Sequence, residues 1–224
     1  MEIVSLVPHN SIVGDVGTDH GYIPAYLISN NISKYIIATD ISQGSLNKAI
    51  NYVKELQFEK RIETRLGNGL EIFKPFEIDT VIIAGMGGLL IQEILEQNIE
   101  MTNSITNFIL QPMIAGKELR EYLINNKFKI VKETLAKEDN KFYEIIYAKK
   151  GIDSIDKDIY FEIGKSLIIN NHPLLKEFVE YKIQSTLNIL KDLEGISSEK
   201  GRTRYEELTN KVNGYREVLT EIES

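Results

Sequence analysis

The sequence predicts an α/β protein, with a doubly wound sheet of seven mostly parallel strands followed by an antiparallel α-helical hairpin. Apolar strand patterns alternate with helical patterns from residue 11 to about residue 149, which is typical of βαβ units. After Lys150 the apolar residues recur every three or four positions, which is typical of paired helices. We therefore expect one domain over residues 1–150 and a coiled-coil hairpin over residues 151–224.

Strands are expected near residues 11–16, 35–40, 61–66, 79–84, 106–111, 128–134 and 142–149. Helices are expected between them, near residues 22–29, 43–56, 68–73, 88–97 and 116–125. The turn 137–141 between the last two strands is too short for a crossover helix. These strands should therefore pair as a hairpin and give the sheet one antiparallel strand.

The C-terminal segment begins with a short helix expected over residues 160–169. Apolar residues then step by threes and fours from residue 175 to 193 and again from 205 to 222. We expect an antiparallel hairpin with residues 195–203 as its tip and one face open to a partner. The alternative is a pair of helices that only complete the core of the first domain.

The composition is that of an ordinary globular protein of 224 residues, with 42% hydrophobic and 26% charged residues. The chain has no cysteine, which excludes thiolate nucleophiles, disulfides and cysteine zinc sites, and we expect no metal requirement. No apolar run reaches membrane-spanning length, and residues 1–7 lack the pattern of a signal peptide. We expect a cytoplasmic protein without a membrane partner.

The formal net charge of -7 argues against a protein that binds nucleic acid over its whole surface. Residues 101–150 nevertheless carry 9 basic and 6 acidic groups. A second basic cluster consists of Lys200, Arg202 and Arg204. Each region predicts either a local RNA-binding surface or an ordinary solvated face.

The first strand leads into an acidic, glycine-rich turn that begins at Asp15. Its glycines lack the G-x-G-x-x-G spacing that seats a pyrophosphate, because they are Gly14, Gly17 and Gly21. Asp15 would repel a pyrophosphate but could accept hydrogen bonds from a cationic amino acid group. Asp40, followed by Ile41, ends the second strand, where such folds place the acid that binds ribose hydroxyls. The pattern favours S-adenosylmethionine over NAD; an acidic turn without a ligand is the alternative.

Two later turns complete the expected cofactor site. Asn68 and Gly69 follow the third strand, where an amide could accept a hydrogen bond from an adenine amino group; an ordinary Asn-Gly turn is the alternative. The fourth strand ends in Gly85, Met86 and Gly87. This is more glycine than a turn requires, so the backbone should approach a ligand closely there.

Several motifs extend through the chain, namely Asp15–Pro24, Ala84–Gly88, Leu110–Pro112, Leu119–Leu123 and the pair Tyr143–Glu144. With these motifs the sequence resembles the bacterial tRNA (adenine(22)-N(1))-methyltransferase family, TrmK. The resemblance implies a class I Rossmann-like methyltransferase domain with a C-terminal coiled coil, S-adenosylmethionine as the methyl donor and an adenine of tRNA as the acceptor. The chain departs from the family pattern at Asn68, where an aspartate is usual, and it has little of the basic leader helix.

The implied acceptor needs no catalytic base, because ring nitrogen 1 of adenine carries a lone pair and no proton at neutral pH. The protein should align the reacting atoms, and an oxygen that accepts from the exocyclic amine would stabilise the cationic product. We expect that oxygen from Gln111 or from the backbone of residues 85–87, around Met86. Asp19 and His20 should shape the methionine end and the base entrance; the alternatives are a structural histidine and, for Gln111, a strand end with a solvated side chain.

Ring nitrogen 1 lies on the Watson–Crick edge, so the target adenine must be unpaired or extruded. The expected tRNA contacts are Tyr22, as a stacking face, and the basic residues Arg120, Lys127, Lys129, Lys141, Lys200, Arg202 and Arg204. A core aromatic is the alternative for Tyr22.

Other functions compete with this prediction. A small-molecule methyltransferase would share the cofactor site, and a non-catalytic scaffold would use the hairpin to bind a protein. An NAD oxidoreductase fits least, because the sequence has neither the phosphate fingerprint nor a Tyr-x-x-x-Lys pair.

Overall fold

The computed structural model describes residues 2–195 and 198–223. The chain divides into two compact units. Unit 1 comprises Met1–Ala136 and Tyr143–Ser154, and unit 2 comprises Lys137–Phe142 and Ile155–Ser224.

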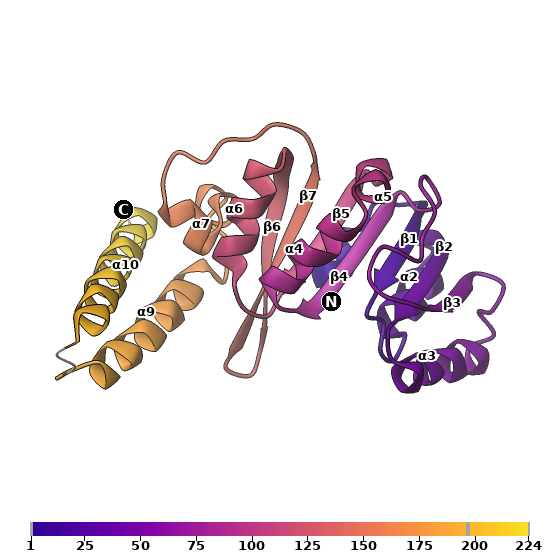
Figure 1. The fold of residues 1–224 in the computed structure, drawn as a ribbon, viewed down its shortest axis with the longest axis horizontal. Helices are drawn as coiled ribbons and strands as arrows, with labels where there is room; N and C mark the ends of the chain where they lie inside the picture. The colour runs from indigo at the N-terminus through magenta and orange to yellow at the C-terminus, as the bar shows by residue number, and fades with distance from the viewer. Residues whose placement is uncertain (1, 196–197, 224) are drawn as a thin grey trace. The chain divides into compact units, whose positions relative to one another are not determined.

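A seven-stranded sheet organises unit 1, in the order β3-β2-β1-β4-β5-β7-β6 (Figure 1). Its strands are β1 (Ser11–Val16), β2 (Ser33–Asp40), β3 (Ile62–Leu66), β4 (Thr80–Met86), β5 (Asn107–Pro112), β6 (Phe128–Glu138) and β7 (Lys141–Lys150). The first five strands are parallel, and β7 pairs antiparallel with β5. The expected sheet with one antiparallel strand is confirmed. The strand order reverses between β1 and β4, which is where doubly wound folds bind ligands.

Helices cover both faces of this sheet. They are α1 (Glu2–Ser5), α2 (Tyr22–Ser29), α3 (Gln43–Glu55), α4 (Gly88–Gln97), α5 (Ile99–Ser104) and α6 (Gly116–Asn125). Neighbouring residues of β4 enter opposite cores, because Val81 and Ile83 pack with residues of α4, α5 and α6, whereas Ile82 packs with residues of α1, α2 and α3. A strand buried on both faces explains the uninterrupted apolar run in the sequence.

Two predictions for unit 1 are wrong. Residues 68–73 form turns and not a helix, and Gly69 has a φ of 54°, which an α-helix does not accommodate. The short helices α1 and α5 were not predicted. Helix α5 has six residues and begins at a cap in which Asn98 Oδ1 accepts a hydrogen bond from Met101 N at 3.0 Å. A helix of this length is too short to show apolar periodicity.

Unit 2 contains α7 (Ile159–Ile163), α8 (Lys165–Ile169), α9 (Leu175–Asp192) and α10 (Glu199–Glu223). Helices α9 and α10 pack together through a cluster of Leu190, Leu208 and Val212. The coiled-coil geometry of this pair stays a prediction.

Two details of unit 2 differ from the prediction. The helix expected over residues 160–169 is interrupted at Gly164, which has a φ of 101°. The expected tip, residues 195–203, is shorter, because α10 already begins at Glu199; residues 196–197 of that tip lie outside the described residues. Across the part of the chain that the structure describes, every helix is too short or too polar to cross a lipid bilayer.

Candidate functional site

The carboxyl ends of β1, β2 and β4 meet where the strand order reverses. Asp15 on β1 lies between β2 and β4 in the sheet register. Beyond β1 the chain turns across β2, because Gly17 N and Thr18 N donate to Thr39 O at 2.8 and 2.9 Å. These bonds place the acidic turn directly over the ends of the strands.

Asp40 is held in a fixed orientation at the end of β2. Its Oδ1 accepts from Ser42 N at 2.8 Å, and its Oδ2 accepts from Asp19 N at 3.2 Å. Each oxygen keeps a further lone pair for a hydroxyl donor, as binding of a ribose diol requires. Ile41 beside it is 72% exposed, so an apolar surface adjoins the carboxylate.

Asp15 is a buried acid with an altered pKa. Burial, opposed in part by Thr18 and reinforced by the charge of Asp40, raises the pKa of its carboxyl to about 6. Asp15 and Asp40 together favour a cationic partner, because a positive charge stabilises both carboxylates in their ionised form. The pair therefore suits an ammonium or sulfonium group of a ligand.

Thr18 supplies a further polar group that suits a ligand. Its Oγ1 is buried and makes no hydrogen bond of normal geometry with any described residue, although Thr18 lies close enough to Asp15 to lower its pKa. A buried polar atom without a partner costs about 1–3 kcal/mol. Binding of a polar ligand group would remove this cost.

Gly85 leaves open space at the end of β4. It has a φ of 77° and lies at an irregularity in the β4–β5 pairing between Ala84 and Met86. A Cβ placed on Gly85 would meet nothing within 4 Å. Left-handed backbone facing open space lets a ligand approach the chain closely. With Asp15 and Asp40, this geometry fits S-adenosylmethionine, which carries a ribose and a cationic amino acid end.

Gln111 holds this turn from β5. Its Oε1 accepts from Gly85 N at 3.0 Å, and its Nε2 donates to Pro112 O at 3.0 Å. The residue is 6% exposed, so the alternative of a solvated side chain is wrong. Met86 lies beside the first turn, because a Cβ on Gly17 would stand 2.4 Å from Met86 Cε. The structure thus brings Gly17, Gly85, Met86 and Gln111 together.

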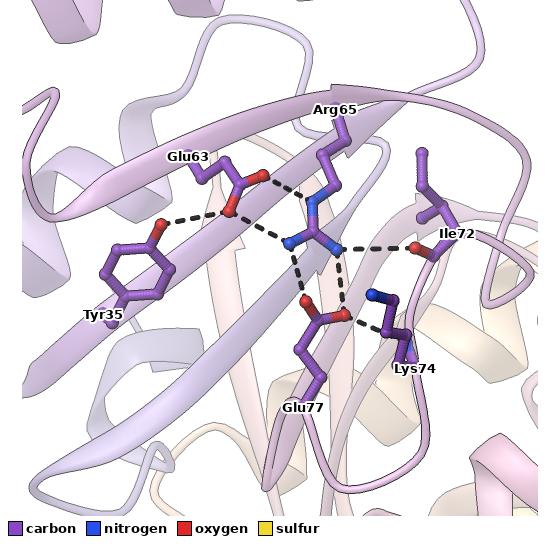
Figure 2. A network of polar contacts seen from close by, with 6 residues as sticks. All are labelled: Tyr35, Glu63, Arg65, Ile72, Lys74 and Glu77. Atoms are coloured by element: carbon purple, nitrogen blue, oxygen red, sulfur yellow. Dashed lines mark hydrogen bonds and ion pairs between the residues drawn. The ribbon is translucent and has the colours of Figure 1, made fainter.

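The turn after β3 contributes Asn68, which is exposed, and Gly69, which is buried. Arg65 ties the segment behind this turn to the sheet (Figure 2). Its guanidinium donates to Glu63 at 2.7 and 3.0 Å and to Glu77 at 2.9 and 2.7 Å. These ion pairs lower the pKa of both carboxyls. This network could not be predicted from the sequence, because no short motif joins Glu63 to Glu77.

Asp19, His20 and Tyr22 form a partly exposed group around the start of α2. His20 Nδ1 lies 2.7 Å from Asp19 Oδ2, and Lys48 Nζ lies 3.2 Å from Asp19 Oδ1; the bond from Lys48 lowers the pKa of Asp19. Tyr22 is 62% exposed and stacks on His20, with ring centroids 5.1 Å apart and planes at 9°. The alternative of a core aromatic is therefore wrong for Tyr22.

Arg120 corrects one predicted RNA contact. It is fully buried in unit 1, with Nε 2.6 Å from Glu133 Oε1 and Nη2 2.7 Å from Glu144 Oε2. These carboxylates raise the pKa of Arg120 further above its already high value against the effect of burial. A guanidinium enclosed in this way joins α6 to β6 and β7 and cannot contact RNA.

The remaining basic candidates are exposed but dispersed. Lys127 and Lys129 flank the first residue of β6. That strand runs parallel to β5, so they lie at the sheet edge opposite the carboxyl ends. The other four belong to unit 2 and are exposed, namely Lys141, Lys200, Arg202 and Arg204.

The fold and the site define the class of this protein. A doubly wound sheet with one antiparallel strand, an acidic turn without a pyrophosphate fingerprint and an open glycine turn beside it are typical of a Rossmann-like, S-adenosylmethionine-dependent methyltransferase. The model of the TrmK family, tRNA (adenine(22)-N(1))-methyltransferase, matches residues 13–217. The chain belongs to this family.

Known relatives resemble nearly the whole chain. A tRNA (adenine(22)-N(1))-methyltransferase of Bacillus subtilis is 28% identical over 223 residues, which are 97% of this chain and 94% of the relative. The structure of M. capricolum TrmK with S-adenosyl-homocysteine has a TM-score of 0.83 at 30% identity, covering 99% of this chain and 96% of that one. A Streptococcus pneumoniae protein in complex with S-adenosyl-L-methionine has a TM-score of 0.87 at 28% identity, covering 97% and 96%.

Proposed function

We propose that this protein transfers the methyl group of S-adenosylmethionine to ring nitrogen 1 of the adenine at position 22 of tRNA. The observation that carries the proposal is the family match over residues 13–217. The arrangement of Asp15, Thr18, Asp40 and Gly85 supports it, because it offers an acidic pair, a hydroxyl and open backbone at one strand edge. We place this activity in the cytoplasm, where tRNA is found.

S-adenosylmethionine supplies an electrophilic methyl group bonded to a sulfonium. Asp40 would bind the ribose hydroxyls, since its oxygens are already oriented by Asp19 N and Ser42 N. Asp15 and Thr18 would bind the cationic amino acid end, and the ligand charge would keep Asp15 ionised at neutral pH. Asn68 and Gly69 would line the adenine end of the cofactor.

Transfer to ring nitrogen 1 requires no proton removal, so the residues have to position the two reactants. Gln111 fixes the turn at Gly85, and this rigid backbone would face the acceptor base near Met86. Because Gln111 is only 6% exposed whereas Gly85 is exposed, the backbone of residues 85–87 is the better source of the oxygen that accepts from the exocyclic amine. Alignment of this kind accounts for a large part of the rate enhancement in group transfer.

We assign tRNA binding chiefly to the exposed basic residues of unit 2, Lys141, Lys200, Arg202 and Arg204. Arg204 forms an ion pair with Glu207 at 2.9 Å, which offsets its charge. Lys200 and Arg202 on the first turns of α10 are therefore the stronger candidates. Tyr22 and His20, stacked at the start of α2, would contact the nucleotides that approach the site.

A methyl-transfer assay with two transcripts tests the proposed function. One tRNA transcript carries adenine at position 22, and the other carries guanine there. We expect transfer of labelled methyl to the first alone, and loss of transfer with Asp40→Ala. Labelling of both transcripts, or labelling only of small metabolites, would favour a different methyltransferase. Absence of S-adenosylmethionine binding in calorimetry would favour the scaffold alternative.

A further inference from the structure

The loop between β5 and α6 exposes apolar side chains next to the open turn of β4. Every residue of β5 is buried, but Met113 and Ile114, which follow it, are 51% and 73% exposed. An isolated exposed apolar residue is ordinary on a protein surface. Here, however, the exposed residues lie beside the residues to which the reaction is assigned.

This loop is held rigidly in place. Met113 N donates to Met86 O at 2.8 Å, and Gly88 N donates to Ile114 O at 2.9 Å. Ala115 adopts a left-handed conformation with a φ of 57°, which is costly for a residue with a Cβ. Two hydrogen bonds and one strained residue therefore hold the backbone of Ile114 in one position.

Ile114 also lies directly against the turn of residues 85–87 at the end of β4. A Cβ placed on Gly87 would stand 3.6 Å from Ile114 Cγ1. Gly87 in turn follows Gly85 and Met86, the residues that face the acceptor in the proposed function. The exposed side chain is thus next to the position that the target adenine must reach.

We propose that Ile114 acts as an apolar wedge that keeps the target adenine out of its base stack. This inference rests on the proposed function, since methylation of ring nitrogen 1 requires an adenine whose Watson–Crick edge is accessible. Apolar side chains that insert between bases stabilise such unstacked states. A rigid isoleucine fits this role, because ordering it on binding costs little side-chain entropy.

The test compares Ile114→Ala with two other variants on two transcripts. Ile114→Leu keeps an apolar side chain of the same size, and Ile152→Ala removes another exposed isoleucine, which is 88% exposed, elsewhere in unit 1. The first transcript is the natural tRNA. The second carries a mismatch that leaves the target adenine unpaired. Single-turnover methylation rates and calorimetric binding of S-adenosylmethionine are measured for each protein.

We expect Ile114→Ala to slow methylation of the natural tRNA by about tenfold or more, because the unstacked base then loses the apolar contact that stabilises it. On the mismatched transcript its rate should return to within about threefold of the wild-type rate. Ile152→Ala should behave as wild type, Ile114→Leu should retain methylation within about threefold of the wild-type rate, and cofactor affinity should be unchanged in all of them. Equal slowing on both transcripts, or no slowing on either, would overturn the wedge. Wild-type protein that methylates neither transcript would overturn the proposed function itself.

Discussion

Substitution of Gly88 by alanine tests the contact that joins the β4 and β5 turns. A Cβ on Gly88 would stand 2.2 Å from Ala115 O and 2.9 Å from Ala115 C, whereas ordinary contact begins at 3.4 Å. The loop at Ala115 must therefore retreat by more than about 1 Å, and overpacking of this kind costs about 1–3 kcal/mol. For a protein of this size the melting temperature should fall by about 2–12 °C.

The neighbouring Gly87→Ala variant provides a matched control. Gly87 has a φ of -68°, and its added Cβ would lie 3.6 Å from the nearest atom. Alanine fits there without strain and restricts the unfolded chain, so the melting temperature should stay level or rise slightly. Thermal unfolding followed by circular dichroism measures both variants. Equal stability of Gly88→Ala and Gly87→Ala would show that Gly88 does not pack against Ala115.

Three further predictions concern charged groups. Since the pKa of Asp15 is raised to about 6, the folded state binds the extra proton, and the wild type should gain about 1.4 kcal/mol relative to Asp15→Asn from about pH 7.5 to about pH 5; urea unfolding at both pH values with no such gain would contradict this. Arg120→Met should lower the free energy of unfolding by about 3–5 kcal/mol, because buried Glu133 and partly buried Glu144 lose their cation, and a loss as small as that of exposed Arg204→Ala would contradict this. The double variant Lys200→Gln with Arg202→Gln should weaken tRNA binding and flatten its salt dependence at unchanged cofactor affinity; an unaltered salt slope in filter binding would exclude α10 from the tRNA surface.

Much of the fold could be predicted from local patterns. Helices α2, α4 and α6 have the predicted limits, because each begins beside a glycine and ends before an asparagine. Residues 68–73 showed part of such a pattern, yet the backbone at Gly69 is left-handed. This backbone conformation depends on how the turn packs. Gly69 lies so close to Gln97 that an added Cβ would stand 2.3 Å from its Oε1. No local pattern contains that contact.

In the candidate site, too, some residues could be placed from the sequence, whereas the role of others depends on three-dimensional packing. Asp15, Asp40 and Gly85 follow strand ends, so the sequence already placed them at one edge of the sheet. Arg120 could not be judged by counting charges, because its partners Glu133 and Glu144 come from later strands. Gln111 or the backbone of residues 85–87 was expected to contact the substrate amine, but the sequence could not show that Gln111 is buried and accepts a hydrogen bond from Gly85 N. Thr18 lies inside the predicted turn, but the sequence does not mark it as a site residue. Its buried Oγ1, which has no hydrogen-bond partner among the described residues, does so.

Nucleoside mass spectrometry of the methylated tRNA identifies both the modified base and the modified atom. Unmodified tRNA is incubated with the protein and methyl-labelled S-adenosylmethionine and then digested to nucleosides. We expect one labelled product, 1-methyladenosine, which is absent when guanine replaces the adenine at position 22. Label on guanosine, on the exocyclic amine of adenosine or on no nucleoside at all would contradict it.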